Sequence, residues 1–463
     1  MKRFAGVGSG VLAAVISAST MVRADPPAPA SQPSRSDLEA QVQALQARVA
    51  QLEQQQRQQQ QPQQSATTST ATSTDGSSIL ESDRTAQAVL HDAERRTAQQ
   101  VPLLGNYQNG RFVLASDNGD FLLHPWLQLQ VRYTVNWRQD APPNGDDDTQ
   151  SGFELRRMKF GFDGNLWGKD LTYNFIWATG RSTGTPSLEE AWFMFKFAPD
   201  WAVRAGQLKD PLTHEGLTSG KRLMAAERSF LEDTIGLGDN FVQGATLVYN
   251  SGNALAAEFG VTDGIGSANT NFEDQPTNTT DWGVVGRVQY KLFGKWSDYD
   301  DFTALGTKQN LLVIGAAGDY TEAGATDTFT HTVDAHFETP GGLGVYAAYM
   351  ARYIRNSAAT GADVYDWGGL GQVSYLIPGT KWEPFGRWDY LRLDSKGQPA
   401  GTELNIHELT AGVNYYFAGH AAKFTLDGTW LPNGTPIPDS GADILVDNGN
   451  NEILVRVQFQ LLI

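Results

Sequence analysis

Basic side chains recur at the polar positions of segments in which polar and apolar residues alternate. Residues two apart on a β-strand share a face, so these bases would lie on the polar face of a sheet. Arginine and lysine there could replace the hydration shell of an anion, and arginine can bind two phosphate oxygens at once. The candidate set comprises strand positions and positions in one long intervening segment: Arg132, Arg157, Lys159, Arg204, Arg287, Arg352 and Arg456, then Lys221, Arg222 and Arg228.

Acidic residues share this polar parity and provide the alternative. Asp163, Glu258, Asp334 and Glu338 could pair with the arginines and merely fix the shape of the sheet, which is the simpler interpretation for any single arginine. The chain has a net charge of −17. Charges in outer loops act weakly beyond a Debye length of about 8 Å, so the charges beside a narrow path decide its selectivity. Among the polar-face residues, bases outnumber acids.

Catalytic and metal chemistry find little support in the sequence. The chain has no cysteine, which excludes disulfides and thiolate metal sites. Its histidines lack metal-ligand spacing, because the closest pair, His331 and His336, would face opposite sides of a strand. No nucleophile elbow, phosphate loop or dinucleotide fingerprint occurs. We therefore expect no enzyme activity, no metal or other cofactor, and no nucleic-acid partner.

Long alternating strands must position the basic residues. In residues 127–137, Leu, Val, Tyr and Trp alternate with Gln, Arg, Thr and Asn without an error. Such a strand rises roughly 33 Å, and a tilt of about 40° reduces this to about 25 Å, the height of an outer-membrane apolar band. A strand of a soluble β-sandwich is usually about half as long. The length therefore favours a strand that crosses lipid.

The last segment, residues 452–463, repeats the pattern and needs a partner strand. Pairing with the first strand would close the sheet into a barrel, as lipid requires because it offers backbone groups no hydrogen bonds. The repeats number about sixteen, and no apolar run reaches the ~20 residues of a transmembrane helix. The sequence predicts an all-β fold, an antiparallel transmembrane β-barrel over residues 110–463.

The segments before the barrel have other patterns. Residues 1–24 combine a basic start, a short apolar run and a Val-x-Ala cleavage signature, which predicts a signal peptide and export. Residues 25–64 hold a Pro/Ser linker and a heptad seam that predicts a short coiled coil, with a solitary solvated helix as the alternative. The seam consists of Leu38, Val42, Leu45, Val49 and Leu52. Residues 65–109 have the composition of a linker.

Residues 207–240 interrupt the alternating strands. The segment is too long for a turn and carries Lys209 and the three loop bases beside Glu215, Glu227 and Glu232. A long ordered loop in a barrel can fold into the lumen and set its bore. We therefore expect a constriction loop, with a solvent-exposed external loop as the alternative.

Several motifs resemble the phosphate-selective porin O and P family. They are the run 153–164 with its Arg-Arg pair, Glu190-Ala191-Trp192, the Gly-Gln-Leu-Lys-Asp-Pro corner at 206–211, Glu227-Arg228-Ser229 and the closing residues 456–460. The resemblance covers about residues 110–463. It implies a trimeric, anion-preferring outer-membrane channel whose partners are small phosphate-like anions and outer-membrane lipid, with Arg157 and Lys159 on its wall. The chain departs from the family in its terminal Ile463, where an aromatic residue is usual, and in its acidic balance.

Three classes of function remain open. The first is an anion-permeable porin, the second a general porin or one that passes cations or sugars, and the third a structural barrel whose coiled coil anchors the envelope. A sugar channel would show a run of lumenal aromatic residues. The predicted inward set contains only Trp192, Tyr346 and Tyr416 as isolated aromatic candidates.

Overall fold

The computed structural model describes residues 104–108, 111–140, 148–271, 282–447 and 449–463. The predicted signal peptide and coiled coil lie outside the described residues. The strands are β1 (Leu104–Gln108), β2 (Arg111–Ala115), β3 (Leu122–Arg138), β4 (Thr149–Asn165), β5 (Leu171–Thr179), β6 (Pro186–Ala198), β7 (Trp201–Lys209), β8 (Phe241–Asn250), β9 (Leu255–Thr262), β10 (Trp282–Phe293), β11 (Leu311–Ala323), β12 (Thr326–Glu338), β13 (Leu343–Arg355), β14 (Val364–Tyr375), β15 (Trp382–Arg392), β16 (Asn405–Tyr416), β17 (Ala422–Leu431) and β18 (Glu452–Leu462).

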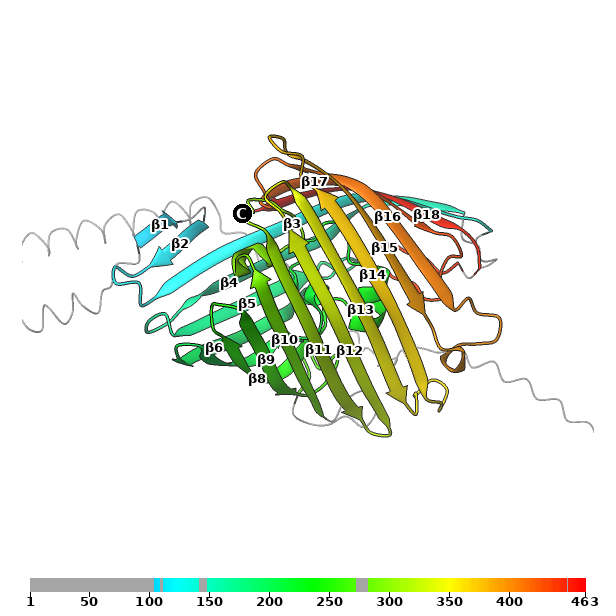
Figure 1. Ribbon diagram of the computed structural model, residues 1–463, viewed down its shortest axis with the longest axis horizontal. Helices are drawn as coiled ribbons and strands as arrows, with labels where there is room; N and C mark the ends of the chain where they lie inside the picture. The colour runs from blue at the N-terminus through cyan, green and yellow to red at the C-terminus, as the bar shows by residue number, and fades with distance from the viewer. Residues whose placement is uncertain (1–103, 109–110, 141–147, 272–281, 448) are drawn as a thin grey trace, which may run out of the picture. The chain divides into compact units, whose positions relative to one another are not determined.

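Strands β3 to β18 form a closed antiparallel barrel of sixteen strands (Figure 1). Each strand pairs with the next, and β18 returns to β3, with Glu452 opposite Arg138 and Leu462 opposite Gln128. Ile463 continues the pairing, because its main chain exchanges hydrogen bonds of 2.8 and 2.9 Å with Leu127. The predicted fold class is confirmed, and the terminal isoleucine pairs as an ordinary closing residue.

Strands β1 and β2 stand outside the sixteen. They pair with each other, and the end of β2 pairs with the start of β3 through Leu114 and Ala115. β1 therefore occupies residues that the sequence analysis assigned to the end of the linker. We call the end of the barrel where β3 begins and β18 ends the terminal end, and the opposite end the loop end.

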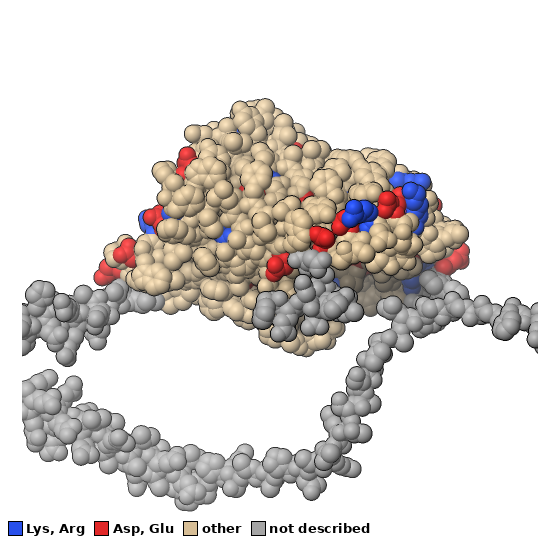
Figure 2. All heavy atoms as spheres, turned by 90° about the horizontal axis from the view of Figure 1, so that it is seen from below, with Lys and Arg blue, Asp and Glu red and all other residues tan. Residues whose placement is uncertain are grey.

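The barrel wall is apolar outside and polar inside. Along β18 the exposed residues are Ile453, Val455, Val457 and Phe459, while Arg456 and the glutamines between them are buried. Figure 2 shows a face on which charged residues gather toward the sides and leave a broad uncharged area between them. No helix among the described residues is long and apolar enough to cross a membrane. The outer wall therefore presents to its surroundings the apolar band that lipid requires.

Three connections fold into the barrel and fill much of it. The first, residues 210–240, joins β7 to β8 and contains a short helix α3 (His214–Leu217), capped by Thr213, and a π-helical turn η1 (Glu232–Gly236). The others are residues 294–310 at the terminal end and 432–451 at the loop end, with the short helix η2 (Trp296–Asp298) in the former. A further short helix, η3 (Ser395–Gly397), follows β15.

The apolar core lies inside the barrel, against the strands from β13 onward. It contains residues of all three connections together with wall residues: Leu223, Met224, Phe230, Leu231, Ile235, Phe302, Ala442 and Ile444, packed with Tyr346, Met350, Leu370, Phe385 and Leu391. Inward polar side chains hold the loop backbone as well, since Glu408 accepts from the N–H of Phe230 at 2.7 Å and Asn414 donates to the carbonyl of Met224 at 2.9 Å. Packed side chains therefore fill the lumen on the side of these strands.

Candidate functional site

A β-bulge in β4 turns two consecutive arginines into the lumen. Gln130 of β3 lies opposite Arg157, but the next residue, Val131, lies opposite Leu155, so Arg156 is an extra residue without a partner in the ladder. Strict alternation would turn Arg156 outward. A bulge aims both side chains to the same side, and Arg156 and Arg157 both bind Glu227 of loop 210–240.

A second bulge does the same for two acids in β6. Ile176 of β5 lies opposite Glu190, and Trp177 lies opposite Leu188, so Glu189 is the extra residue. Glu190 accepts hydrogen bonds from Asn174 at 3.0 Å and from the Trp192 indole at 2.8 Å, while Glu189 binds Lys159 at 2.6 Å. Sequence reasoning missed Arg156 and Glu189 as lumenal residues. The signal that could have found them is a charged doublet inside an otherwise alternating strand.

The first charged cluster, which we call the Glu227 cluster, surrounds the carboxylate of Glu227. Arg132, Arg156 and Arg157 approach Glu227 at 2.7, 2.9 and 2.7 Å. Burial alone would raise the pKa of Glu227, but the three guanidinium groups hold that pKa well below its usual range. Two acids and one further arginine complete the cluster: Glu154, Asp443 and Arg181. Four guanidinium groups thus face three carboxylates.

The second cluster, which we call the Asp239 cluster, includes Lys159, which lies two residues beyond Arg157 on β4 toward the terminal end. Lys209 and Arg228 both approach Asp239 at 2.9 Å, and Lys159 approaches it at 3.9 Å while binding Glu189. Burial would raise the pKa of Asp239, but Arg228, Lys209 and Lys159 keep that pKa well below its usual range. Three bases here face two carboxylates.

The other predicted bases are distributed around the wall in separate pairs. Arg287 binds Asp334 at 2.8 Å, Arg352 binds Asp366 at 3.3 Å, and Arg456 binds Asp427 at 2.7 Å. Arg204 pairs with Glu258, and Arg222 of loop 210–240 binds Asp300 of loop 294–310 at 3.0 Å. The structure therefore brings together Arg132, Arg157, Lys159 and Arg228 along one side of the lumen and leaves Arg287 and Arg352 apart from them. Arg456 pairs with Asp427 but stands opposite Thr134 of β3, beside the Glu227 cluster. The remaining predicted acids bind histidines, Asp163 with His124 and Glu338 with His336.

Lys221 differs from the other nine predicted bases. Among the described residues no carboxylate lies within ion-pair distance of its ammonium group, which instead sits 4.7 Å from the centre of the Trp126 ring. Burial, together with the nearby charges of Arg222 and Arg111, lowers the pKa of Lys221 to about 8. Lys221 is therefore a cation that an approaching anion can meet without displacing an acid.

Two polar cavities follow the wall formed by β3 to β6. The terminal-end cavity, of about 930 Å³, is lined by Gln128 of β3 and Lys159 of β4, and by Lys221 of the loop. The loop-end cavity, of about 590 Å³, is lined by Thr134 of β3 and Glu154 of β4. On β3, Arg132 lies between the two cavities, and on β4 the arginine doublet does. The Glu227 cluster is therefore the barrier between them.

The terminal-end cavity also corrects the expectation about aromatic residues. Its lining includes Trp126, Tyr173, Trp192, Trp296 and Tyr299, of which the sequence analysis had named only Trp192. Tyr346 and Tyr416, by contrast, are buried in the filled part of the lumen, 1% and 2% exposed. The lumenal aromatics therefore gather at one end rather than standing singly.

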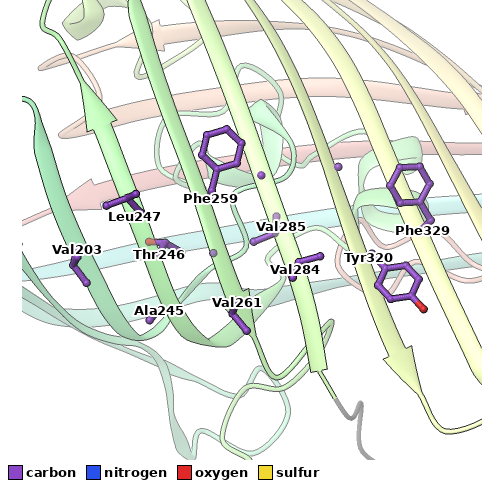
Figure 3. Close-up of a pocket in the computed structure, with 13 residues that line it drawn as sticks. Val203, Ala245, Thr246, Leu247, Phe259, Val261, Val284, Val285, Tyr320 and Phe329 are labelled. Carbon is purple, nitrogen blue, oxygen red and sulfur yellow. The ribbon is translucent and has the colours of Figure 1, made fainter.

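A further hollow lies on the outside of the barrel and does not belong to the path. Figure 3 shows it over β7 to β12, with Val203, Leu247, Phe259, Val284 and Phe329 among its lining residues. These side chains are exposed and alternate along their strands with lumenal residues such as Glu258 and Arg287. The hollow is part of the apolar outer wall.

A closed barrel with an apolar outer wall, a polar lumen and long loops folded inside has the architecture of an outer-membrane porin, a channel-forming protein. The chain belongs to the phosphate-selective porin O and P family, whose model matches residues 127–430.

Individual relatives are distant. An uncharacterized protein of Aquifex aeolicus (strain VF5) is 22% identical over 356 residues, which span 67% of this chain and 83% of the relative. An anion-selective porin from Comamonas acidovorans has a TM-score of 0.52 at 13% identity, covering 74% of this chain and 99% of that chain. OprB of Pseudomonas putida has a TM-score of 0.51 at 9% identity, covering 73% and 94%. At these identities, the likeness shows that this chain shares the fold of the two solved structures.

Proposed function

We propose that this porin lets small, phosphate-like anions diffuse along the wall formed by β3 to β6, from one polar cavity to the other. The observation that carries the proposal is the charge balance along that wall. The Glu227 cluster has four guanidinium groups against three carboxylates, and the Asp239 cluster has three bases against two. Each cluster therefore has one more base than the carboxylates it binds. The description of the family as phosphate-selective supports the same solute class.

Basic side chains whose charge is partly neutralised by neighbouring carboxylates suit the transport of anions. An anion must bind well enough to enter a narrow passage and weakly enough to leave it. Arg157 is 4% exposed and already bound to Glu227, so an anion beside it gains only part of the attraction of a free guanidinium group. The two clusters, followed by Lys221 in the terminal-end cavity, form a series of weak sites in which no single site retains the ion.

The zero-current potential across a potassium chloride gradient tests the proposal. Purified protein in planar lipid bilayers should give a potential on the chloride-selective side, and inorganic phosphate should block part of the chloride current. A channel that favours potassium over chloride would contradict the proposed function and leave a general porin.

A second candidate, passage of sugars or other neutral solutes, is favoured by the aromatic lining of the terminal-end cavity. Sugars stack on the faces of aromatic rings, but two of these rings already hold cations: Lys221 lies over Trp126 at 4.7 Å and Arg204 over Trp192 at 5.5 Å. A neutral disaccharide that blocks the potassium chloride current more than a polyol of equal viscosity would support this candidate. We expect equal effects.

Assembly and orientation extend the proposal. We infer a homotrimer in the outer membrane, as the family resemblance implies. We place the terminal end toward the periplasm, because most of the turns at that end are short. Contacts between barrel walls would provide most of the trimer interface. A role as an envelope anchor depends on residues 25–64, which lie outside the described residues. The proposal includes no catalytic step, cofactor or metal.

A further inference from the structure

Loop 432–451 inserts a carboxylate into the Glu227 cluster. The two Asp443 oxygens meet three donors from the wall and from the β5–β6 connection: Arg132 at 2.9 Å, Arg181 at 2.9 Å and the Thr134 hydroxyl at 2.6 Å. The side chain of Arg132 is fully buried, and that of Asp443 is 18% exposed. A single carboxylate therefore occupies a site with two guanidinium groups and a hydroxyl.

The three donors are held by other contacts, so they do not depend on Asp443 for their positions. Arg132 also donates to Glu227 at 2.7 Å and to Glu154 at 2.8 Å. Arg181 donates to Glu154 at 3.0 Å and to the carbonyl of Ser440. Thr134 belongs to β3, whose ladder fixes its backbone. Planar guanidinium groups at fixed positions suit the tetrahedral oxygens of phosphate as well as the two oxygens of a carboxylate.

The loop backbone is shaped to aim Asp443 at this site. Asp443 has φ of 60°, in the left-handed region that costs most side chains energy but that Asp and Asn tolerate. Asn136 donates to the carbonyl of Asp443 at 2.8 Å, and an antiparallel bridge between Asp439 and Ile444 closes the turn. The carboxylate is therefore presented by a built turn.

The site borders the loop-end cavity. The loop-end cavity of about 590 Å³ is lined by Thr134, Arg181 and Asp443, so two of the three donors and the acid itself face it. The cavity is large enough for a hydrated oxyanion beside the carboxylate. An arriving anion could take the place of the Asp443 oxygens before passing to Arg156 and Arg157.

We propose that Arg132, Thr134 and Arg181 form an oxyanion-binding subsite at the loop end of the path, and that the Asp443 carboxylate occupies this subsite when no solute is bound. The loop supplies an internal mimic of the solute, which lowers the affinity of the entrance for anions. Exchange between carboxylate and oxyanion involves only hydrogen bonds and ion pairs. The inference depends on the proposed anion path and adds to it a specific entrance site and its occupant.

Two variants test the subsite, with inorganic phosphate as the probe. D443N removes the charge and D443G removes the side chain, and both residues tolerate the left-handed backbone of position 443. Block of the chloride current by phosphate should then occur at a concentration about two- to threefold lower, the factor for one unit charge about 7 Å from the ion in water. The zero-current potential should move further toward chloride selectivity. D363N is the matched control, because Asp363 is an exposed acid at the same end that contacts none of the three donors.

The expected gain must also depend on the subsite itself. In the double variant R181Q/D443N the gain over the wild type should disappear, because one of the two guanidinium donors is lost. Unheated protein that still migrates faster than boiled protein in gels shows that each variant retains a closed barrel.

The outcomes separate the inference from the proposed function. A chloride-selective wild type whose D443N and D443G variants show unchanged phosphate block overturns the subsite and leaves the anion path intact. A potassium-selective wild type overturns the anion path, whatever the variants do. A gain that persists in R181Q/D443N overturns the assignment of Arg181 as a donor.

Discussion

Glu227 accepts a hydrogen bond of 2.7 Å from Arg157, in a pair that is almost fully buried and joins the in-folded loop 210–240 to the barrel wall. The same carboxylate also binds Arg132 and Arg156, so its removal would leave three guanidinium groups without their shared acid. The loop and the wall are therefore joined to each other between the two cavities of the proposed path.

E227Q should lower barrel stability. Breaking one side of a buried ion pair costs on the order of 3–5 kcal/mol, because the remaining charge stays buried without compensation. We expect the fast-migrating form of the unheated protein to be lost at a lower temperature in gel assays. D363N, which neutralises an exposed acid, should leave this temperature unchanged. An unchanged temperature in E227Q would mean that the apolar core alone holds the loop.

Arg157 and Lys159 should set the ion preference. R157Q/K159Q should move the zero-current potential toward cation permeation and weaken phosphate block, because one base is lost from each charged cluster. K308Q is the control, since Lys308 is an exposed base of loop 294–310 away from both clusters. Equal potentials in R157Q/K159Q and the wild type would remove these residues from the path.

The variant R156Q tests whether β4 contains the bulge or alternates strictly. In the structure Arg156 shares Glu227 with Arg157, so R156Q should shift the potential about as far as R157Q does, roughly two- to threefold in the permeability ratio. If β4 alternated without a bulge, Arg156 would face lipid and its replacement would leave ion selectivity unchanged. The comparison therefore tests the bulge by an electrical measurement.

The sequence predicted correctly the features that depend on the alternation of polar and apolar residues along a strand, which water on one face and lipid on the other impose. Residues 127–137 alternate because one face meets lipid and the other the lumen, and they form the middle of β3. The strand number and the closing pair of β18 and β3 follow from the same pattern. The inward parity of Arg132, Arg157 and Arg456 also agrees with the structure, in which all three are buried.

The rest of the site depends on β-bulges and on a long-range loop contact, which follow no repeat in the sequence. A bulge adds one residue and reverses the parity after it, so Arg156 and Glu189 could not be placed by alternation. Asp443 meets Arg132 across 311 positions of sequence, through a loop whose apolar Ala442 and Ile444 join the core. Nothing in residues 432–451 alone shows which wall they will pack against.

Removal of the leader should leave the assembly intact. A variant that keeps the predicted signal peptide, residues 1–24, but lacks residues 25–77 should still form the proposed trimer, because we expect the barrel walls to bury far more area than a two-heptad coil could. Size-exclusion chromatography with light scattering in detergent measures the mass. A monomeric variant beside an oligomeric full-length protein would show that the coiled coil sets the oligomeric state.

Anion preference should fall as the pH rises through about 8, where two loop groups titrate. Burial, with the nearby charges of Arg222 and Arg111, lowers the pKa of Lys221 to about 8, so Lys221 is charged below that pH and neutral above it. Burial, with the nearby charge of Glu215, raises the pKa of Glu232 to about 8, so Glu232 is neutral below that pH and charged above it. Both changes make the lumen less positive as pH rises, while the arginines remain charged.

Zero-current potentials recorded between about pH 6.5 and about pH 9.5 should therefore drift toward cation permeation, with a midpoint near the shared pKa. K221Q should show a smaller drift, because the charge change of Lys221 itself is lost. K221Q/E232Q should show a smaller drift still. Lys221 has the larger effect because it lines the terminal-end cavity, whereas Glu232 is buried behind Thr213 in the loop. A wild type whose potential is constant over this range, or a double variant that keeps the full drift, would show that neither group acts on the permeating ions.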